Sequence, residues 1–170
     1  MKKLFALLLL IALAPARAQT PSLELTARGF EPVSYSTPRI DGKKFTELSK
    51  AWVTELKRMD EKFDLSNVGS NTLTISGLEK NAFFYRSRGE TFQHTAKLVM
   101  KIDFTATGYT LTLTVPETYA EGDTPVKYKL PDYFDSNGKI KEGYDGLKKS
   151  IEATVNGMAI NYYEFIINNR

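Results

Sequence analysis

The sequence has 170 residues, with 23 Lys and Arg against 20 Asp and Glu, and no cysteine. This length is typical of one domain with a single hydrophobic core. The lack of cysteine excludes disulfides, a thiol nucleophile and cysteine-ligated metals.

The start of the chain predicts a secretory signal peptide over residues 1–18. A basic segment, Met1-Lys2-Lys3, precedes an apolar run over residues 4–14 and a small-x-small cleavage site, Ala16-Arg17-Ala18. The run is too short to span a bilayer comfortably, which disfavours the alternative of an N-terminal anchor helix. We expect cleavage before Gln19 and export through the inner membrane to the periplasm or the cell exterior. The mature chain would then not span the membrane.

Loss of the signal peptide changes the charge balance of the protein. Lys2, Lys3 and Arg17 lie in the signal, and removing these three from the 23 cationic side chains leaves 20, equal to the 20 acidic ones. A neutral mature chain gives no reason to expect nucleic acid or an anionic membrane surface as a partner.

The mature chain begins with a mixed polar segment. We expect residues 19–29 to form a flexible leader and residues 30–170 to form a single domain. Val33 and Tyr35, preceded by Pro32, indicate an extended segment. Because proline cannot donate to a β-ladder, this strand is expected at a sheet edge or with an irregularity.

Apolar residues spaced three and four apart after Asp41 predict an amphipathic helix. Asp41 is the expected N-cap, because its carboxylate can accept a hydrogen bond from a free amide of the first turn. We interpret Trp52 as a core residue of this helix and not as a platform for a ligand. The apolar stripe comprises Phe45, Leu48, Trp52, Leu56, Met59 and Phe63.

The clearest strand signal is the alternation of apolar and polar side chains over residues 98–104 and 109–115. It predicts an antiparallel hairpin with one face on the core and one toward solvent. Gly108 is expected to supply the positive φ of the tight connection. Shorter strands are expected over residues 73–77 and, as a separate element, at 83–85.

The passage over residues 116–134 contains several prolines and tyrosines and predicts a long connection, with one short strand at 126–129. A turn follows at 135–138. An apolar stripe then predicts a long closing helix over residues 139–168, whose glycines allow a bend or a later start.

The predicted order is β-α-β-β-β-β-α. Two amphipathic helices and a one-sided sheet bury one another's apolar faces, which predicts an α+β domain of two layers, with an antiparallel meander and both helices on one face of the sheet.

The sequence carries no catalytic signature. His94 is the only histidine and Gly-x-Ser-x-Gly is absent, so a nucleophile with an oriented base is not expected. We expect His94 to be solvated or paired at a sheet edge. The segment Asp135–Gly138 resembles part of a calcium loop, but tyrosines, Tyr133 and Tyr144, occupy the first and twelfth positions of such a loop. We therefore expect no enzyme activity, no metal and no cofactor.

Several segments resemble the domain-of-unknown-function family 4468. They are Lys50-Ala51-Trp52, the strand Asn71–Ile75, the hairpin Leu98–Val115 and the closing helix Gly138–Phe165. The chain departs from the family pattern before Tyr109, where an Asp-Gly turn is absent. The resemblance implies an exported protein of Bacteroidota with a TBP-like fold, and it implies no activity, cofactor or catalytic residue. The fold name alone is no argument for DNA binding.

Three functions remain open. The favoured one is a non-enzymatic module of the cell envelope that binds an unknown envelope protein or polysaccharide. The second is a carrier of a lipid or other apolar molecule, with a pocket like that of a helix-grip fold. The third is a hydrolase with a carboxylate site. The candidate interaction surface combines the polar sheet face with the tyrosines of the connection and comprises Thr72, Thr74, Lys101, Thr110, Thr112, Thr114, Tyr119 and Tyr128.

Overall fold

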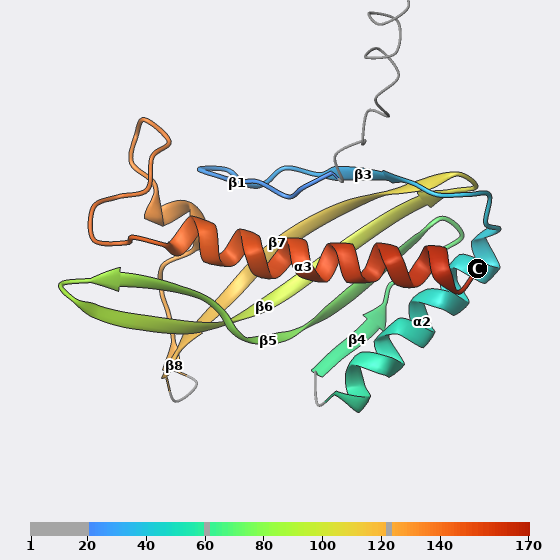
Figure 1. Ribbon diagram of the computed structural model, residues 1–170, viewed down its shortest axis with the longest axis horizontal. Coiled ribbons are helices and arrows are strands. Elements are labelled where there is room, and N and C mark those ends of the chain that lie inside the picture. Colours follow the sequence, from blue (N-terminus) through green and yellow to red (C-terminus); the bar gives the residue numbers. More distant parts are fainter. Residues whose placement is uncertain (1–20, 60–61, 122–123) are drawn as a thin grey trace, which may run out of the picture.

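The structure of the protein is a computed structural model that describes residues 21–59, 62–121 and 124–170 (Figure 1). The predicted signal peptide and its cleavage site lie outside the described residues. The main sheet has six strands in the order β3-β7-β6-β5-β4, with β8 paired to β7, and all pairs are antiparallel. The strands are β3 (Val33–Ser36), β4 (Lys62–Ser66), β5 (Thr72–Ser87), β6 (Glu90–Thr105), β7 (Gly108–Ala120) and β8 (Thr124–Pro125).

Two helices, α2 (Gly42–Arg58) and α3 (Leu147–Asn168), lie on the same face of this sheet, called here the inner face. Their apolar stripes and the inner side chains of the strands form one buried cluster. Every second residue of β6 from His94 to Phe104 is buried, which marks the inner face along the whole strand. The predicted two-layer α+β architecture is confirmed.

The helices are also joined to each other by two polar contacts, one of them inside the core. The indole Nε1 of Trp52 donates to Oδ1 of Asn161 at 2.7 Å. The hydroxyls of Ser49 and Tyr162 lie 2.7 Å apart. Because Trp52 and Tyr162 bury polar atoms that are paired with the other helix, these contacts favour one relative placement of α2 and α3.

Helix α2 begins as the sequence predicts. The side chain of Asp41 accepts from the amide of Lys44 at 2.9 Å. The last two residues of the predicted apolar stripe, Met59 and Phe63, do not belong to it, however. Met59 is 59% exposed, and Phe63 lies on β4, where it is fully buried beneath the helix.

The predicted hairpin is formed by β6 and β7, but the strands are longer than expected. The segments at 73–77 and 83–85 are one strand, β5, interrupted by an irregularity between Glu79 and Phe83. Strand β7 likewise continues through Pro116, with a register shift opposite residues 97–99. Such bulges bend a strand without ending it.

Gly108 is required for a different reason from the one expected. It is absent from the glycines with positive φ. A Cβ at this position would lie 2.5 Å from the carbonyl oxygen of Tyr35 on β3. Glycine therefore allows the edge strand β3 to pair closely with β7, and the expected positive φ is wrong.

The closing helix starts late. Gly143 and Gly146 have φ values of 86° and 87°, which an α-helix does not allow, and α3 begins at Leu147. Residues 139–146 therefore belong to the connection. This connection contains the short 3₁₀ helix η2 (Leu130–Tyr133) and no strand at 126–129.

The segment expected as a flexible leader is packed over its described part. Residues 21–30, called here the N-terminal strap, contain β1 (Leu25–Thr26) and β2 (Gly29–Phe30), which pair with each other. Leu23 and Leu25 are only 2% and 1% exposed. The side chain of Asn156 on α3 accepts from Leu23 N at 2.7 Å and donates to Leu23 O at 2.9 Å, as a neighbouring strand would. The strap is ordered because α3 satisfies its backbone.

We predict opposite effects of alanine at two glycines. Gly108→Ala should destabilise the fold by about 2 kcal/mol or more, since its Cβ meets backbone that cannot move aside cheaply. Gly157→Ala on α3 should stabilise it by up to about 1 kcal/mol, since no atom lies within 4 Å of the added Cβ. Urea unfolding of the two variants measures both effects. Equal stability of Gly108→Ala and the parent would contradict the close approach of β3.

Candidate functional site

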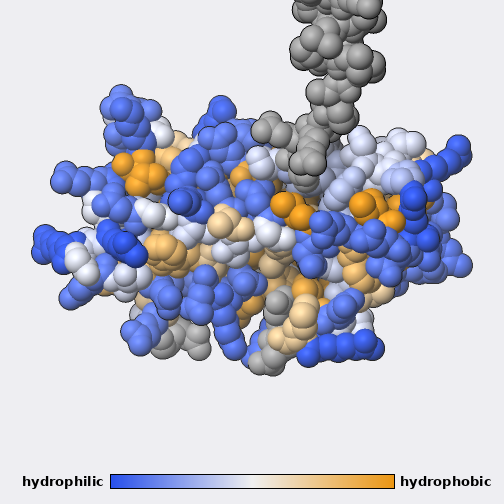
Figure 2. All heavy atoms as spheres, in the orientation of Figure 1, coloured by the Kyte–Doolittle hydropathy of each residue, from blue (hydrophilic) through white to orange (hydrophobic). Residues whose placement is uncertain are grey.

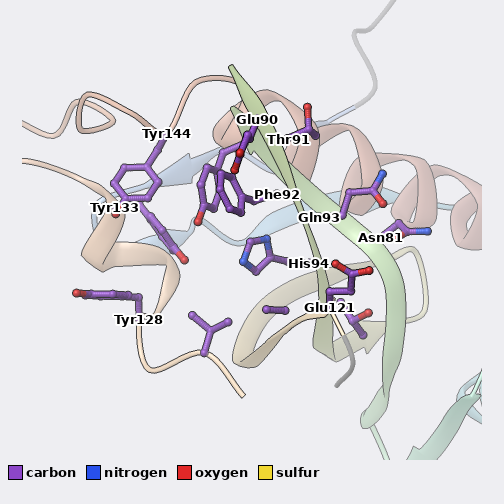
Figure 3. A pocket seen from close by; sticks show the side chains of 14 residues that line it. Asn81, Glu90, Thr91, Phe92, Gln93, His94, Glu121, Tyr128, Tyr133 and Tyr144 are labelled. Carbon is purple, nitrogen blue, oxygen red and sulfur yellow. The ribbon is translucent and has the colours of Figure 1, made fainter. Parts of the chain in front are cut away.

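A cavity of about 950 Å³ (Figure 3) lies near the tip of the β5–β6 hairpin, which Figure 1 shows at the end of the sheet remote from α2. Six ring side chains contribute to its lining, and we call it the tyrosine cavity. They are Tyr85, Phe92, His94, Tyr128, Tyr133 and Tyr144. Figure 3 shows Phe92 and His94 coming from the strand and the tyrosines Tyr128, Tyr133 and Tyr144 from the facing connection.

One wall of the cavity is the outer part of the β5–β6 hairpin, residues 83–94, called here the arm. Phe83 pairs with His94 and Tyr85 pairs with Phe92, so all four side chains lie on the inner face. The irregularity between Glu79 and Phe83 bends the arm, with Asn81 at φ 53°. The bend separates this part of the inner face from the part that the helices cover.

The arm is fixed to the beginning of α3. The hydroxyl of Ser150 accepts from Phe84 N at 3.0 Å and donates to Phe84 O at 2.9 Å. The amide of Arg86 donates to the carbonyl of Asp145 at 2.8 Å. The free edge of β5 is therefore used to position the cavity wall.

The opposite wall is the connection over residues 126–146. Its turn is capped by Asp135, whose carboxylate accepts from the amides of Asn137 and Lys139 at 2.8 and 2.9 Å. The amide of Lys141 donates to the carbonyl of Tyr133 at 2.9 Å. These bonds give a segment without regular structure a defined path, so the tyrosines are held in place.

The tyrosines of the connection meet neighbouring rings at steep angles, whereas Tyr85 and Phe92 on the arm are nearly parallel (5.2 Å between centroids, 22°). Tyr144 is perpendicular both to Tyr85 (4.9 Å between centroids, 70°) and to Tyr133 (4.8 Å, 74°). Tyr128 and Tyr133 are 6.2 Å apart at 53°. Burial raises the pKa of Tyr85 and of Tyr133, so both phenols stay neutral. The cavity therefore offers ring faces in several directions and uncharged hydroxyls.

His94 is buried, and the expectation of a solvated or edge-paired histidine is wrong. It is 4% exposed and stacks on Phe83 at 4.7 Å and on Tyr85 at 5.3 Å. Its Nδ1 has no hydrogen-bond partner. Burial lowers the pKa of His94, which the backbone of Phe92 opposes in part. The imidazole is accordingly neutral near pH 7.

The charged side chains that line the cavity are both acidic. Glu90 begins β6 and Glu121 follows β7, and the lining residues that the structure describes include no Lys or Arg. Within the part of the chain that the structure describes, neither carboxylate forms an ion pair. The fixed charge at the cavity is thus negative.

The predicted threonine surface lies on the outer face of the sheet, opposite the helices. Cross-strand pairing brings most of its members together, and Lys101 lies between two of them. The pairs are Thr72–Asp103, Thr74–Lys101, Lys101–Thr112, Asp103–Thr110 and Val99–Thr114. Lys101 and Asp103 form an ion pair at 2.8 Å. This surface is polar and accessible, and nothing in the structure identifies an occupant.

The two tyrosines of the predicted surface lie elsewhere. Tyr119 and Tyr128 line a smaller cavity of about 310 Å³ between the end of β7 and the connection. Tyr128 is 61% exposed and lines the tyrosine cavity as well. Of the eight predicted residues, only Tyr128 belongs to the larger cavity. The other rings were missed because their grouping depends on the bend in the arm, although Tyr133 and Tyr144 lie in or near the tyrosine-rich passage.

The described ranges contain no group of three or more His, Asp or Glu side chains arranged to hold a metal ion. They also contain no helix that is long and apolar enough to cross a membrane.

The fold is similar to a solved structure. A DUF4468 family protein from Bacteroides ovatus superposes with a TM-score of 0.51, over 80% of this chain and 82% of that chain, at 10% sequence identity. The chain resembles a DUF4468 protein. At this identity the likeness concerns the fold alone. No family model matches the sequence, and no curated protein matches it.

We predict that His94 makes stability depend on pH. Its folded-state pKa is below the ordinary value of 6.5, so the unfolded chain binds the proton more readily. Its contribution to stability is therefore present above pH 6.5 and is lost as the pH falls below that value. His94→Phe preserves the stacking and should lose less unfolding free energy between about pH 7 and pH 5 than the parent. Because His94 is the only histidine, parallel pH profiles of the two proteins would refute the assignment.

Proposed function

We propose that the protein is an exported, non-enzymatic binding module of the bacterial cell envelope whose ligand occupies the tyrosine cavity. The observation that carries this proposal is a preformed concave site with six ring side chains on its walls. Ligand sites are concave, largely apolar and furnished with a few polar groups that orient the ligand. Phenolic hydroxyls and the glutamates supply such groups here.

The setting of His94 among the described residues favours a binding role over histidine-based catalysis. A general base needs a partner that orients it and a reacting group within reach. His94 stacks between aromatic rings, and its Nδ1 has no carboxylate partner. A neutral buried imidazole in this setting contributes shape to the cavity wall.

The outer sheet face remains the second candidate surface, for an envelope protein or a polysaccharide. Its threonines are stiff and polar, which lowers the entropic cost of binding. Part of its hydrogen-bonding capacity is already used, since the hydroxyls of Ser34 and Thr110 lie 3.0 Å apart. The cavity is favoured because it encloses a ligand from several sides.

The alternative function is a carrier of a lipid or other apolar molecule. In its favour, the cavity lies on the inner face of a curved sheet, next to the start of the long helix α3. Against it, the lining includes tyrosine hydroxyls and two carboxylates. The face seen in Figure 2 is largely hydrophilic, with separate hydrophobic patches.

Export is tested by the mass of the protein from the producing cell. We expect the periplasmic or extracellular protein to begin at Gln19, because Ala16-Arg17-Ala18 precedes that residue as a cleavage site. Ala18→Arg should block cleavage and leave the longer precursor. Protein that retains Met1 in the membrane fraction of the parent strain would contradict export as proposed.

Binding is tested by mass spectrometry of small molecules that co-purify with the native protein. The double variant Phe92→Ser/Tyr128→Ser removes two partly exposed rings and should reduce the bound ligand by about tenfold or more, since aromatic contacts are lost without disturbing the core. The control, Thr110→Lys/Thr112→Lys, alters only the outer face and should retain the ligand. If the control variant lost the ligand and the cavity variant retained it, the binding site would be assigned to the outer face instead. A bound lipid would favour the carrier.

A further inference from the structure

The charge at the tyrosine cavity restricts the ligands that can enter it. Glu90 and Glu121 line the cavity without cationic neighbours among its lining residues. An anionic ligand would meet two like charges and no positive side chain to compensate for its loss of hydration. The carboxylates instead favour a cation, and partial exclusion of water strengthens that attraction.

The aromatic rings add to this preference. A ring face is the negative part of the aromatic quadrupole, and a cation is attracted to it within about 6 Å of the centroid. The rings of Tyr85, Tyr133 and Tyr144 lie 4.8 to 6.1 Å from one another. A single positive group of small radius in the cavity can thus be within that range of more than one ring.

The angles between the rings distinguish this arrangement from a stacking platform. A flat ligand such as a sugar ring or a nucleobase is held best by one or more parallel ring faces. On the side of the connection the interplanar angles are 70° and 74° about Tyr144 and 53° between Tyr128 and Tyr133, whereas on the arm Tyr85 lies at 22° to Phe92 and 27° to His94. Walls that face different directions suit a compact, roughly spherical group such as an ammonium.

His94 does not counteract this preference. Because burial lowers its pKa, the imidazole carries no positive charge near pH 7. Its unpartnered Nδ1 is a buried polar atom at the cavity wall, which a polar group of a ligand would satisfy.

We infer that the tyrosine cavity binds a small organic cation through a primary or quaternary ammonium group, held by the faces of its tyrosines and by Glu90 and Glu121. This inference rests on the proposed binding function and names the chemical class of its ligand. It selects ammonium compounds over anions, over flat neutral rings and over lipids without a cationic headgroup.

The inference is tested with a pair of probes that differ in charge alone. Choline and its neutral isostere 3,3-dimethylbutan-1-ol have the same shape, so only choline gains from the ring quadrupoles and the carboxylates. We would titrate each into the mature protein, Gln19–Arg170, and follow backbone amide NMR shifts. We expect choline to shift amides around the cavity and to bind about tenfold more tightly than the alcohol. A higher salt concentration should weaken the binding of choline and leave the binding of the alcohol unchanged.

Exposed positions allow variants that do not threaten the fold. Glu121→Gln should lower the affinity for choline several-fold and leave the affinity for the alcohol unchanged, because the substitution removes a charge and keeps the side-chain shape. Tyr128→Phe keeps a ring face and should retain binding, whereas Tyr128→Leu should weaken it. Thr112→Val on the outer face is the matched control and should change neither probe.

Three outcomes would overturn the inference. They are equal affinities for choline and the alcohol, choline shifts that lie outside the cavity, and no binding of either probe. These results leave the proposed function separately testable, because the ligand that co-purifies with the native protein is identified without choosing a probe. If that ligand is lost from the Phe92→Ser/Tyr128→Ser variant and is neutral, the cavity is a binding site of a different class.

Discussion

The length of the sheet relative to the helix that covers it is the constraint from which the rest of the structure follows. Strand β6 has 16 residues and extends over about 53 Å, whereas the 22 residues of α3 span about 33 Å. Helix α2 covers the far end of the sheet, where it packs on β4. The inner face of the arm therefore needs another cover, and the irregular connection over residues 126–146 supplies it. A connection packs less closely than a helix, so the cavity lies there.

The same constraint explains why the cavity walls are well defined although one of them lacks regular structure. The arm is bonded to the first turn of α3 through Ser150 and to the residue before Gly146 through its backbone. The connection is bonded to itself through Asp135. A site held in this way loses little conformational entropy when a ligand binds. Its rings can therefore contribute most of their contact energy to affinity.

Much of the fold follows from sequence periodicity, because periodicity reports which face of an element is buried. The alternation over 98–104 and 109–115 correctly predicts the β6–β7 hairpin, and the spacing from Phe45 to Leu56 correctly predicts α2. Phe63 fits the helical spacing yet lies on a strand. A single buried residue that follows a helix cannot be told from one more residue of the helical stripe by its spacing alone. The bend near Asn81 depends on tertiary pairing, so the sequence predicts neither the arm nor the burial of His94. Of the cavity, only Tyr128 was predicted as a contact residue.

The N-terminal strap has a consequence for the order in which the protein can be completed. Leu23 and Leu25 take their backbone partners from Glu152 and Asn156, more than 120 residues later in the chain. These partners are synthesised more than 120 residues after the strap, so these two hydrogen bonds form only once α3 has been made. Contacts of such wide sequence separation also form slowly. A chain shortened before Glu152 would therefore leave the backbone of Leu23 and Leu25 without the partners that hold the strap on α3.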